Sequence, residues 1–381
     1  MNVLFIENAG NLNAGAFHSM IALIKLLKEY HINSFVALPD RADGKQLLID
    51  NKIPFIELRA CSYSWMISNN ATFLDIVKMP FKDIAVKIAS FKLAKYIEKN
   101  NIQIVHENTS ACYIGFFAAR ITGAKHIWHI REFMEEDFNN HIWWKQRAVC
   151  MMNGADAIIA ISNAIEEKYK VILKGNNIYK IYNGIIVKDF LDDQKTILTE
   201  VPARLLCVGR ICEGKGQKTL IMALGELKKS NITPYVYFAG SYSEDIHAEY
   251  YNLAKRLNVD SQICFLGQVK DMKTLYKSVD IFCMCSKCEA FGRVTVEAML
   301  AGNLVIGANS GGTPEILGNG KYGLLFDANN YENLANKIKY AIEHSKEMCE
   351  LAEQGRKHAV ENFDAKFNAE RIYNLYNKII N

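Results

Sequence analysis

Several features that would place this chain in a specialised class of protein are absent from its sequence. No apolar run approaches the roughly 18 to 20 residues that a membrane-spanning helix needs, and no basic leader precedes the first apolar segment. The formal net charge is only +4 over 381 residues, which is too low for a nucleic-acid-binding protein. Repeats and low-complexity tracts are also missing. The sequence therefore predicts a cytoplasmic globular protein without a nucleic-acid partner.

Signals for metal and disulfide sites are also weak. The ten cysteines are scattered and do not form the framework of a small disulfide-rich domain, so reduced thiols are expected. Cys285 and Cys288 form a C-x-x-C pair, but no second pair or nearby histidine completes a zinc site. No Asp-x-Asp pair occurs either. We therefore expect neither a metal nor another cofactor.

What the sequence does contain is two successive series of short apolar runs that alternate with helical patterns. Such runs, bounded by helices, are typical of parallel strands buried on both faces. The first series comprises 3–6, 34–38, 102–106, 126–129 and 157–160, and the second comprises 205–208, 235–239, 263–266, 280–285 and 304–307. Helices are expected between them, among others at 17–30, 84–100 and 111–122. Two such series predict two doubly wound α/β domains.

The predicted domains are residues 1–188 and 200–362, joined by the polar stretch 187–201. An amphipathic helix at 363–381 follows the second series. In open α/β sheets, ligands bind beyond the carboxyl ends of the strands. We therefore expect the site among the loops that follow the strands, in a cleft between the two domains.

The most informative stretch runs from Cys285 to Gly302 and contains two carboxylates, Glu289 and Glu297, on either side of a Phe-Gly turn. The first is predicted in a loop after a strand, and the second in a helix that begins near Arg293. A strand, a glycine turn and a helix N-terminus form an anion site in that order. The stretch resembles the E-x7-E signature of the retaining, nucleotide-sugar-dependent glycosyltransferases of family 4, which have the GT-B fold.

A second motif opens the second domain, in the segment from Gly209 to Gly216. Arg210 and Lys215 flank a turn between a strand and a helix, and two cations beside a helix N-terminus suit a diphosphate. Either cation alone would be read as an ordinary surface residue. The passage resembles the G-R-x-x-x-x-K-G segment of the family, which contacts the donor phosphates.

The two carboxylates receive different predicted roles. Glu297 is expected to bind the ribose, because one carboxylate can accept from both vicinal hydroxyls; the alternative is an exposed helix glutamate. Glu289 is expected to hold the transferred sugar and the phosphate, and the alternative is a solvated loop acid. The remaining predicted donor-binding residues of this domain are Val269, Phe291, Gly292 and Arg293. The paired glycines Gly311 and Gly312 are expected to let the backbone approach a ligand.

The first domain is expected to bind the acceptor. Its loop 8–15 is not G-x-G-x-x-G, so a dinucleotide-binding loop is not predicted there. The loop resembles the first βα loop of the family, which places Gly15 near the donor phosphates. The segment after the strand at 126–129 resembles the position where the family has a histidine that contacts the donor sugar, and His129 is the match; the alternative is a structural histidine. Asn183 and Gly184 are expected to mark a hinge.

Residues 75–100 contain six lysines among aromatic and apolar residues, and Lys92, Lys95 and Lys99 share one helical face. A solvated face is one interpretation. Peripheral contact with an anionic membrane is the other, and it would suit a lipid-linked acceptor.

The resemblance implies a metal-independent retaining glycosyltransferase that moves a sugar from a nucleotide-diphosphate donor, with UDP favoured, to a hydroxyl of a glycan or lipid-linked acceptor in bacterial surface polysaccharide synthesis. It implies that the C-terminal helix crosses back to the first domain. His129, Arg210, Lys215 and Glu289 are then the predicted catalytic residues. Two alternatives stay open: a GT-B-fold UDP-sugar 2-epimerase, and a non-catalytic subunit that binds a sugar nucleotide.

Overall fold

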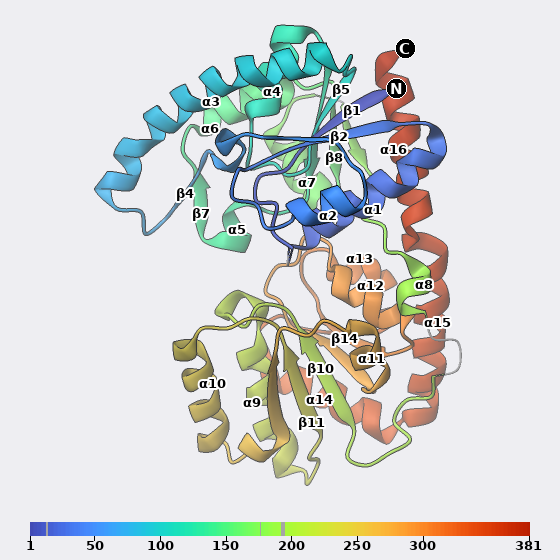
Figure 1. Cartoon of the computed structure of the whole chain (residues 1–381). Coiled ribbons are helices and arrows are strands. Elements are labelled where there is room, and N and C mark those ends of the chain that lie inside the picture. Colours follow the sequence, from blue (N-terminus) through green and yellow to red (C-terminus); the bar gives the residue numbers. More distant parts are fainter. Residues whose placement is uncertain (13, 176, 192–194) are drawn as a thin grey trace. The chain divides into compact units, whose positions relative to one another are not determined.

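A computed structural model describes residues 1–12, 14–175, 177–191 and 195–381. The chain divides into two compact units (Figure 1). Unit 1 comprises Met1–Gly184 and Ala365–Asn381, and unit 2 comprises Ile185–Asp364. The sequence placed the domain ends at 188 and 362, so the chain leaves unit 1 slightly earlier and returns to it slightly later than predicted. Residues 192–194 of the predicted join lie outside the described residues.

Unit 1 is built on a seven-stranded parallel sheet in the order β3-β2-β1-β5-β6-β8-β9. Its strands are β1 (Asn2–Ile6), β2 (Asn33–Leu38), β3 (Phe55–Glu57), β5 (Ile104–Glu107), β6 (Lys125–Ile130), β8 (Ala157–Ala160) and β9 (Ile178–Lys180). The five predicted strands of this series are confirmed. The two outermost strands were missed because each has only three residues, which is too short to show a pattern.

Helices cover this sheet on both faces, as the prediction of a doubly wound domain requires. They are α1 (Gly15–Leu27), α2 (Lys45–Asp50), α3 (Phe73–Lys99), α4 (Ile114–Thr122), α5 (Glu135–Phe138), α6 (Lys145–Asn153), α7 (Asn163–Ile172) and the C-terminal α16 (Ala365–Ile380). A separate antiparallel pair joins β4 (Met66–Ser68) to β7 (Asn140–Ile142). The point where the strand order reverses lies between β1 and β5.

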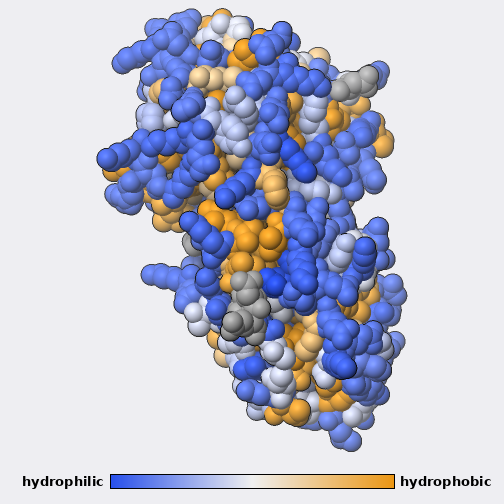
Figure 2. All heavy atoms as spheres, turned by 90° about the vertical axis from the view of Figure 1, so that its right-hand side faces the viewer, coloured by the Kyte–Doolittle hydropathy of each residue, from blue (hydrophilic) through white to orange (hydrophobic). Residues whose placement is uncertain are grey.

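The C-terminal helix α16 belongs to the core of unit 1, which confirms the predicted crossing. Its residues Ala369, Ile372, Leu375 and Tyr376 are buried in one cluster with Phe17 and Ile21 of α1 and Phe5 of β1. Figure 1 shows α16 beside α1. Most of the surface seen in Figure 2 is hydrophilic, and hydrophobic residues gather in patches on it. The amphipathic pattern of the sequence is therefore explained by packing on unit 1.

The helix α3 is longer than predicted. The sequence pattern indicated 84–100, but the helix begins at Phe73 and has 27 residues. Thr72 caps its N-terminus: the Thr72 hydroxyl accepts from the backbone of Asp75, and the Asp75 carboxylate accepts from the backbone of Thr72. Pro80 lies inside the helix. A proline reads as a helix breaker in sequence, so the first turns were missed.

Unit 2 contains a six-stranded parallel sheet in the order β12-β11-β10-β13-β14-β15. Its strands are β10 (Arg204–Val208), β11 (Tyr235–Ala239), β12 (Ile263–Gly267), β13 (Ile281–Met284), β14 (Leu304–Ala308) and β15 (Leu324–Phe326). Its helices are α8 (Val187–Phe190), α9 (Gln217–Lys229), α10 (Glu244–Arg256), α11 (Met272–Lys277), α12 (Arg293–Leu300), α13 (Thr313–Ile316), α14 (Tyr331–Glu343) and α15 (Ser345–Phe363). The strand order reverses between β10 and β13, so the loops that follow these two strands lie side by side.

Candidate functional site

In unit 2, the two loops at the reversal point pack closely against each other. Gly216, at the start of α9, has φ of 71°, and a side chain there would place Cβ 2.0 Å from the carbonyl oxygen of Cys285 after β13. The backbone N–H of Lys287 donates to the carbonyl oxygen of Gly214 at 3.0 Å. Only glycine fits this approach, which brings the predicted cation segment and the predicted carboxylate segment together.

This approach brings Lys215 against Glu289. The Lys215 ammonium donates to Oε2 of Glu289 at 2.7 Å, and the side chains are 35% and 19% exposed. A lysine ammonium has three N–H donors, so it can bind a phosphate oxygen while it keeps this carboxylate. Arg210 is exposed at the end of β10, and its backbone carbonyl accepts from Gln217 at 3.1 Å. The predicted cations therefore lie on one loop, and Lys215 contacts one of the predicted carboxylates.

The paired glycines Gly311 and Gly312 contact the backbone of Glu289. A Cβ on Gly311 would lie 2.3 Å from the carbonyl oxygen of Glu289, and the N–H of Gly312 donates to that oxygen at 2.7 Å. The backbone that these glycines approach in the structure is that of the Glu289 loop, and their approach to a ligand stays a prediction. Their effect on the site is to fix the position of Glu289.

The second carboxylate, Glu297, lies on the second turn of α12 and is only 7% exposed. The guanidinium of Arg293 donates to its Oε1 at 3.3 Å, and the hydroxyl of Tyr276 donates to its Oε2 at 3.2 Å. Burial, with a further contribution from Glu297, holds the pKa of Tyr276 well above its usual range, so the tyrosine remains a donor. A carboxylate has about four acceptor positions, and therefore two remain for a ligand.

Of the other predicted residues of unit 2, some border the loop that carries Glu289 and one does not. Gly292 directly precedes α12, which leaves the first N–H groups of that helix beside the Glu289 loop. The side chain of Phe291 is buried and packs edge-on against Phe363, with ring centroids 5.7 Å apart. Val269 follows β12, which is separated from β10 by β11. Phe291 is thus a packing residue whose backbone borders the site, and Val269 lies two strands away.

In unit 1, His129 lies inside β6 and is fully buried. Its Nδ1 is 3.0 Å from Nε2 of His106 and 3.2 Å from a terminal nitrogen of Arg131. The other ring nitrogen of His106, Nδ1, is 2.6 Å from the hydroxyl of Tyr376 on α16. The predicted sugar-contacting histidine is therefore the centre of a buried chain of polar groups.

The directions of these hydrogen bonds follow from Arg131. A guanidinium can only donate, so Nδ1 of His129 is an acceptor and carries no proton. His106 then donates from Nε2 to the same nitrogen, and its own Nδ1 accepts from Tyr376. The proton of His129 is then on Nε2, which is buried and has no hydrogen-bond partner among the described residues. Burial, and then the charge of Arg131, lowers the pKa of both histidines well below the usual range, in agreement with neutral rings.

The network continues to the first loop of the unit. Nε of Arg131 donates to the carbonyl oxygen and to the side-chain oxygen of Asn108, each at 3.1 Å, and NH1 of Arg131 donates to Oδ1 of Asn183. Asn108 donates to Glu7 at 2.7 Å, and Glu7 accepts from the N–H groups of Ala9 and Gly10. The ends of four strands are therefore connected.

His129 was the predicted catalytic residue of this network. Asn183 was read as a hinge, but its side chain accepts from Arg131. The available signal was the position of polar residues at the ends of consecutive buried strands, for example Glu7, His106 and Asn108. Gly15 is the first residue of α1, and the carbonyl of the next residue accepts from Asn108 at 3.2 Å. Residue 13 of the predicted loop lies outside the described residues.

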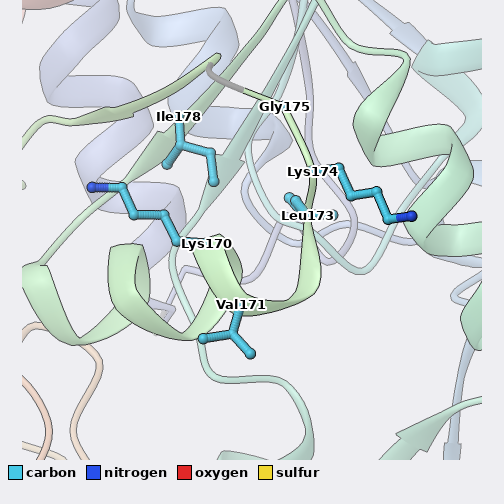
Figure 3. Close-up of a pocket in the computed structure, with 6 residues that line it drawn as sticks. All are labelled: Lys170, Val171, Leu173, Lys174, Gly175 and Ile178. Carbon is cyan, nitrogen blue, oxygen red and sulfur yellow. The ribbon is translucent and has the colours of Figure 1, made fainter.

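A hollow on unit 1 lies between the end of α7 and β9 (Figure 3). It is lined by Lys170, Val171, Leu173, Lys174, Gly175 and Ile178. The two lysine side chains point away from each other (Figure 3). Because no polar groups converge there, this hollow lacks the features of a ligand site.

No three His, Cys, Asp or Glu side chains of the described part of the chain are grouped as metal ligands would be. Among the same residues, no helix has the length and apolar character of a membrane span. A G-x-G-x-x-G pattern does occur at 318–323, but it precedes β15 instead of following a strand, which is not the setting of a dinucleotide-binding loop.

Two family models match adjoining parts of the chain. The model described as "Glycosyl transferases group 1" matches residues 189–358, and that described as "Glycosyltransferase Family 4" matches residues 75–188. The first contains the predicted phosphate and carboxylate segments, and the second contains His129. Together they cover 75–358.

Curated relatives match over shorter stretches. Spore coat protein SA of Bacillus subtilis is 30% identical over 185 residues, which are 46% of this chain and 48% of that protein. The lipopolysaccharide core biosynthesis mannosyltransferase LpcC of Rhizobium leguminosarum is 26% identical over 238 residues, 59% of this chain and 65% of that protein. The chain thus spans about half to two thirds of the length of these relatives.

Solved structures match over the whole chain. A glycosyltransferase from Rickettsia africae has a TM-score of 0.80 at 23% identity and covers 100% of this chain and 98% of its own. Anabaena Alr3699/HepE in complex with UDP has a TM-score of 0.80 at 23% identity and covers 99% and 100%. At this identity the likeness shows the fold, and it confirms the predicted fold class of two α/β units with parallel sheets.

Proposed function

Because this chain belongs to the group 1 and family 4 glycosyltransferases of the GT-B type, we propose that it transfers a sugar from a nucleotide-diphosphate donor to a hydroxyl of a glycan or lipid-linked acceptor, with retention of configuration. UDP is the proposed nucleotide. Similarity to a lipopolysaccharide core mannosyltransferase and to a UDP-bound structure supports this assignment. The observation that carries it is the contact between Lys215 and Glu289 at the reversal point of the unit 2 sheet.

In the proposed complex, Arg210 and Lys215 bind the diphosphate from one side. The N–H groups at the start of α12 bind it from the other. Glu297 accepts from the ribose hydroxyls, since Arg293 and Tyr276 use only part of its acceptor capacity. These residues come from the ends of two neighbouring strands and are held by glycine contacts. The donor would therefore bind to a preformed surface of unit 2.

The proposed reaction breaks the bond between the anomeric carbon and the phosphate oxygen. The acceptor oxygen forms the new bond on the same face, and its proton passes to the departing diphosphate oxygen. Arg210 and Lys215 stabilise the negative charge that develops on the leaving group, so we propose that no metal is needed. Glu289 positions the sugar and neutralises Lys215 before the donor binds.

A donor screen tests this function. The purified protein would be incubated with UDP-, GDP- and ADP-sugars and a mixture of glycan and lipid-linked acceptors, and nucleotide release would be measured. Release of UDP that requires an acceptor supports the proposal. Conversion of UDP-N-acetylglucosamine to an epimer without acceptor would instead support the epimerase. Tight UDP binding without turnover for any donor would support the non-catalytic subunit.

We also propose peripheral contact with an anionic membrane through α3. Large apolar side chains recur along one face of this helix and are 41% to 77% exposed: Phe73, Leu74, Val77, Phe81, Ile84, Ile88 and Phe91. The opposite face carries the residues that pack into unit 1, from Met79 to Ile97. Figure 1 shows α3 along the outer side of unit 1, beside α4. An exposed apolar stripe of this length indicates a binding surface.

The charges on α3 favour a membrane over a second copy of the chain. Lys92, Lys95 and Lys99 continue the exposed face beyond the apolar stripe. The helix carries six lysines against Asp75, Asp83 and Glu98, a net charge of 6 − 3 = +3. Two copies would bring like charges together, whereas an anionic lipid surface attracts them, at about 1 kcal/mol per lysine.

Vesicle flotation tests this surface. The double variant Phe81→Ser, Ile88→Ser should bind phosphatidylglycerol vesicles about tenfold more weakly, because two apolar side chains no longer enter the lipid. Val171→Ser is the matched control, since Val171 is also an exposed apolar residue of unit 1 but lies on α7. Equal flotation of all three proteins would contradict the proposal. A concentration-dependent dimer that the double variant abolishes would assign the stripe to a second copy instead.

A further inference from the structure

Tyr376 on α16 lies at one end of a buried chain of hydrogen bonds whose other end is an unused donor. Its hydroxyl donates to Nδ1 of His106 at 2.6 Å, and Nε2 of His106 donates to Nδ1 of His129 at 3.0 Å. All three side chains are fully buried. The hydrogen bonds end at the N–H on Nε2 of His129, for which the described part of the chain supplies no acceptor.

From the contact between Arg131 and Nδ1 of His129 we infer one set of proton positions in neutral rings. If these hydrogen bonds ran in the opposite direction, Nδ1 of His129 would carry a proton that faces an N–H of Arg131. In that case His106 would donate to the hydroxyl of Tyr376 and could no longer accept from it. The hydroxyl of Tyr376 and the guanidinium of Arg131 thus determine the direction of these hydrogen bonds, and the proton of His129 is on Nε2.

A buried N–H without an acceptor is unfavourable, and a ligand oxygen would satisfy it. The site is built for a neutral donor, because Arg131 already supplies a positive charge 3.2 Å from the ring and burial disfavours a second one. A neutral imidazole can bind a sugar hydroxyl without repelling the positive charge that develops on the sugar ring in transfer. The ring is fully enclosed in this structure, so a ligand reaches Nε2 only after the residues that cover it shift.

We propose that Tyr376 is a positioning residue that acts through His106 to hold the proton of His129 on Nε2, so that His129 donates to an oxygen of a sugar substrate. The sugar ligand rests on the proposed glycosyl transfer; the tautomer does not. The proposal also gives α16 a role beyond packing, because its Tyr376 determines which ring nitrogen of His129 carries the proton.

The first test reads the tautomers directly, without turnover. Protein labelled with ¹⁵N in its nine histidines would be examined by long-range ¹H–¹⁵N correlation, and His106→Gln would help assign the signals. We expect both His106 and His129 as neutral rings protonated on Nε2. A proton on Nδ1 of His129, or a doubly protonated ring at pH 7, would overturn the proposal whatever the activity of the protein.

The second test compares Tyr376→Phe with Tyr373→Phe. Tyr373 lies on the same helix and stacks on Tyr30, with ring centroids 4.6 Å apart, and no hydrogen bond or ring contact among the described residues joins it to His106 or His129. Loss of the Tyr376 hydroxyl should change the ¹⁵N shifts of His106 and His129 and lower kcat about tenfold, equal to about 1.4 kcal/mol in the barrier. The KM for the donor should change little, since the diphosphate is bound elsewhere. The Tyr373 variant should match the wild type in both readouts.

Variants of His106 separate positioning from simple support of the fold. His106→Gln keeps a side-chain N–H that can donate to Nδ1 of His129, so it should retain the tautomer and most of the activity. His106→Leu removes that donor and should lose both. Equal behaviour of the two variants would contradict the proposal. If no donor is ever turned over, the tautomer shifts still decide the positioning role, and the failure then belongs to the proposed function alone.

Discussion

The two units have the same type of sheet but arrange their polar groups in opposite ways. Unit 1 buries its network, including Glu7, His106 and His129, and connects these groups to one another. Unit 2 leaves Arg210 exposed and Lys215 about one third exposed, on a loop at the reversal point. The difference indicates two tasks. Exposed cations are suited to binding a charged diphosphate, whereas a buried neutral network is suited to fixing the orientation of a few donors.

The comparison is tested most strongly by removing a cation from unit 2. Lys215→Gln should lower kcat about 100- to 1,000-fold, because one of the groups that stabilise the leaving diphosphate is lost. Lys218→Gln is the matched control, since Lys218 pairs with Glu249 at the surface, with both side chains about half exposed. Steady-state kinetics with an excess of donor would measure both. Similar rates for the two variants would remove Lys215 from the proposed mechanism.

A smaller loss is expected at the buried carboxylate. Glu297→Gln should weaken UDP binding at least about tenfold in calorimetry, because a hydrogen bond to a charged acceptor contributes about 1.5–3 kcal/mol. The substitution keeps the volume of the side chain and a contact with Arg293 or Tyr276. Glu332→Gln on α14 serves as a control at an exposed glutamate of the same unit. Unchanged affinity for UDP would contradict the ribose role.

Buried groups should make the stability of the two units depend on pH in opposite directions. Burial lowers the pKa of His106 and of His129 in the folded state, so their unfolded forms bind more protons below about pH 6.5. Stability of unit 1 is therefore complete above that pH and is lost as the pH falls, by about 1.4 kcal/mol per unit for each histidine. In unit 2, burial raises the pKa of Tyr276, so its stability declines as the pH rises above about 10.

Calorimetric unfolding between pH 5 and pH 8 would check the acid limb. His106→Gln should reduce the acid loss because one titrating ring is removed, while His344→Gln, at an exposed position of unit 2, should not. An acid loss of the same size in all three proteins would show that these rings do not control it.

The smallest effect concerns metal ions. If Arg210 and Lys215 supply the positive charge at the diphosphate, then EDTA should leave the rate unchanged. Nucleotide release with and without chelator would measure this. Loss of turnover in EDTA that Mg²⁺ restores would show that the loop of unit 2 needs a metal.

The sequence was most informative where a pattern is local. The strands of both series were predicted, because buried parallel strands form short apolar runs. The segments with Lys215 and Glu289 were also identified, since each is a contiguous motif. The first turns of α3 and the three-residue strands β3, β9 and β15 were missed. A short strand has too few residues to show a period, and a proline obscured the helix.

The candidate site divides in the same way. A motif predicted His129 as a site residue. Its partners His106 and Tyr376 could not be predicted, since Tyr376 is 270 residues from His106 in the sequence. The neighbours of Gly311 could not be predicted for a related reason. Its freedom of backbone conformation was evident, but the atoms that it meets belong to the Glu289 loop.

By itself, the sequence determined that this chain forms two α/β units, and it determined which loops carry the charged groups, because hydrophobic patterns and short motifs depend on neighbouring residues. Only the tertiary structure decided which groups meet: Lys215 with Glu289, Glu297 with Tyr276, and His129 with His106 and Arg131. These contacts depend on the strand order and on close backbone packing, and no local pattern contains that information.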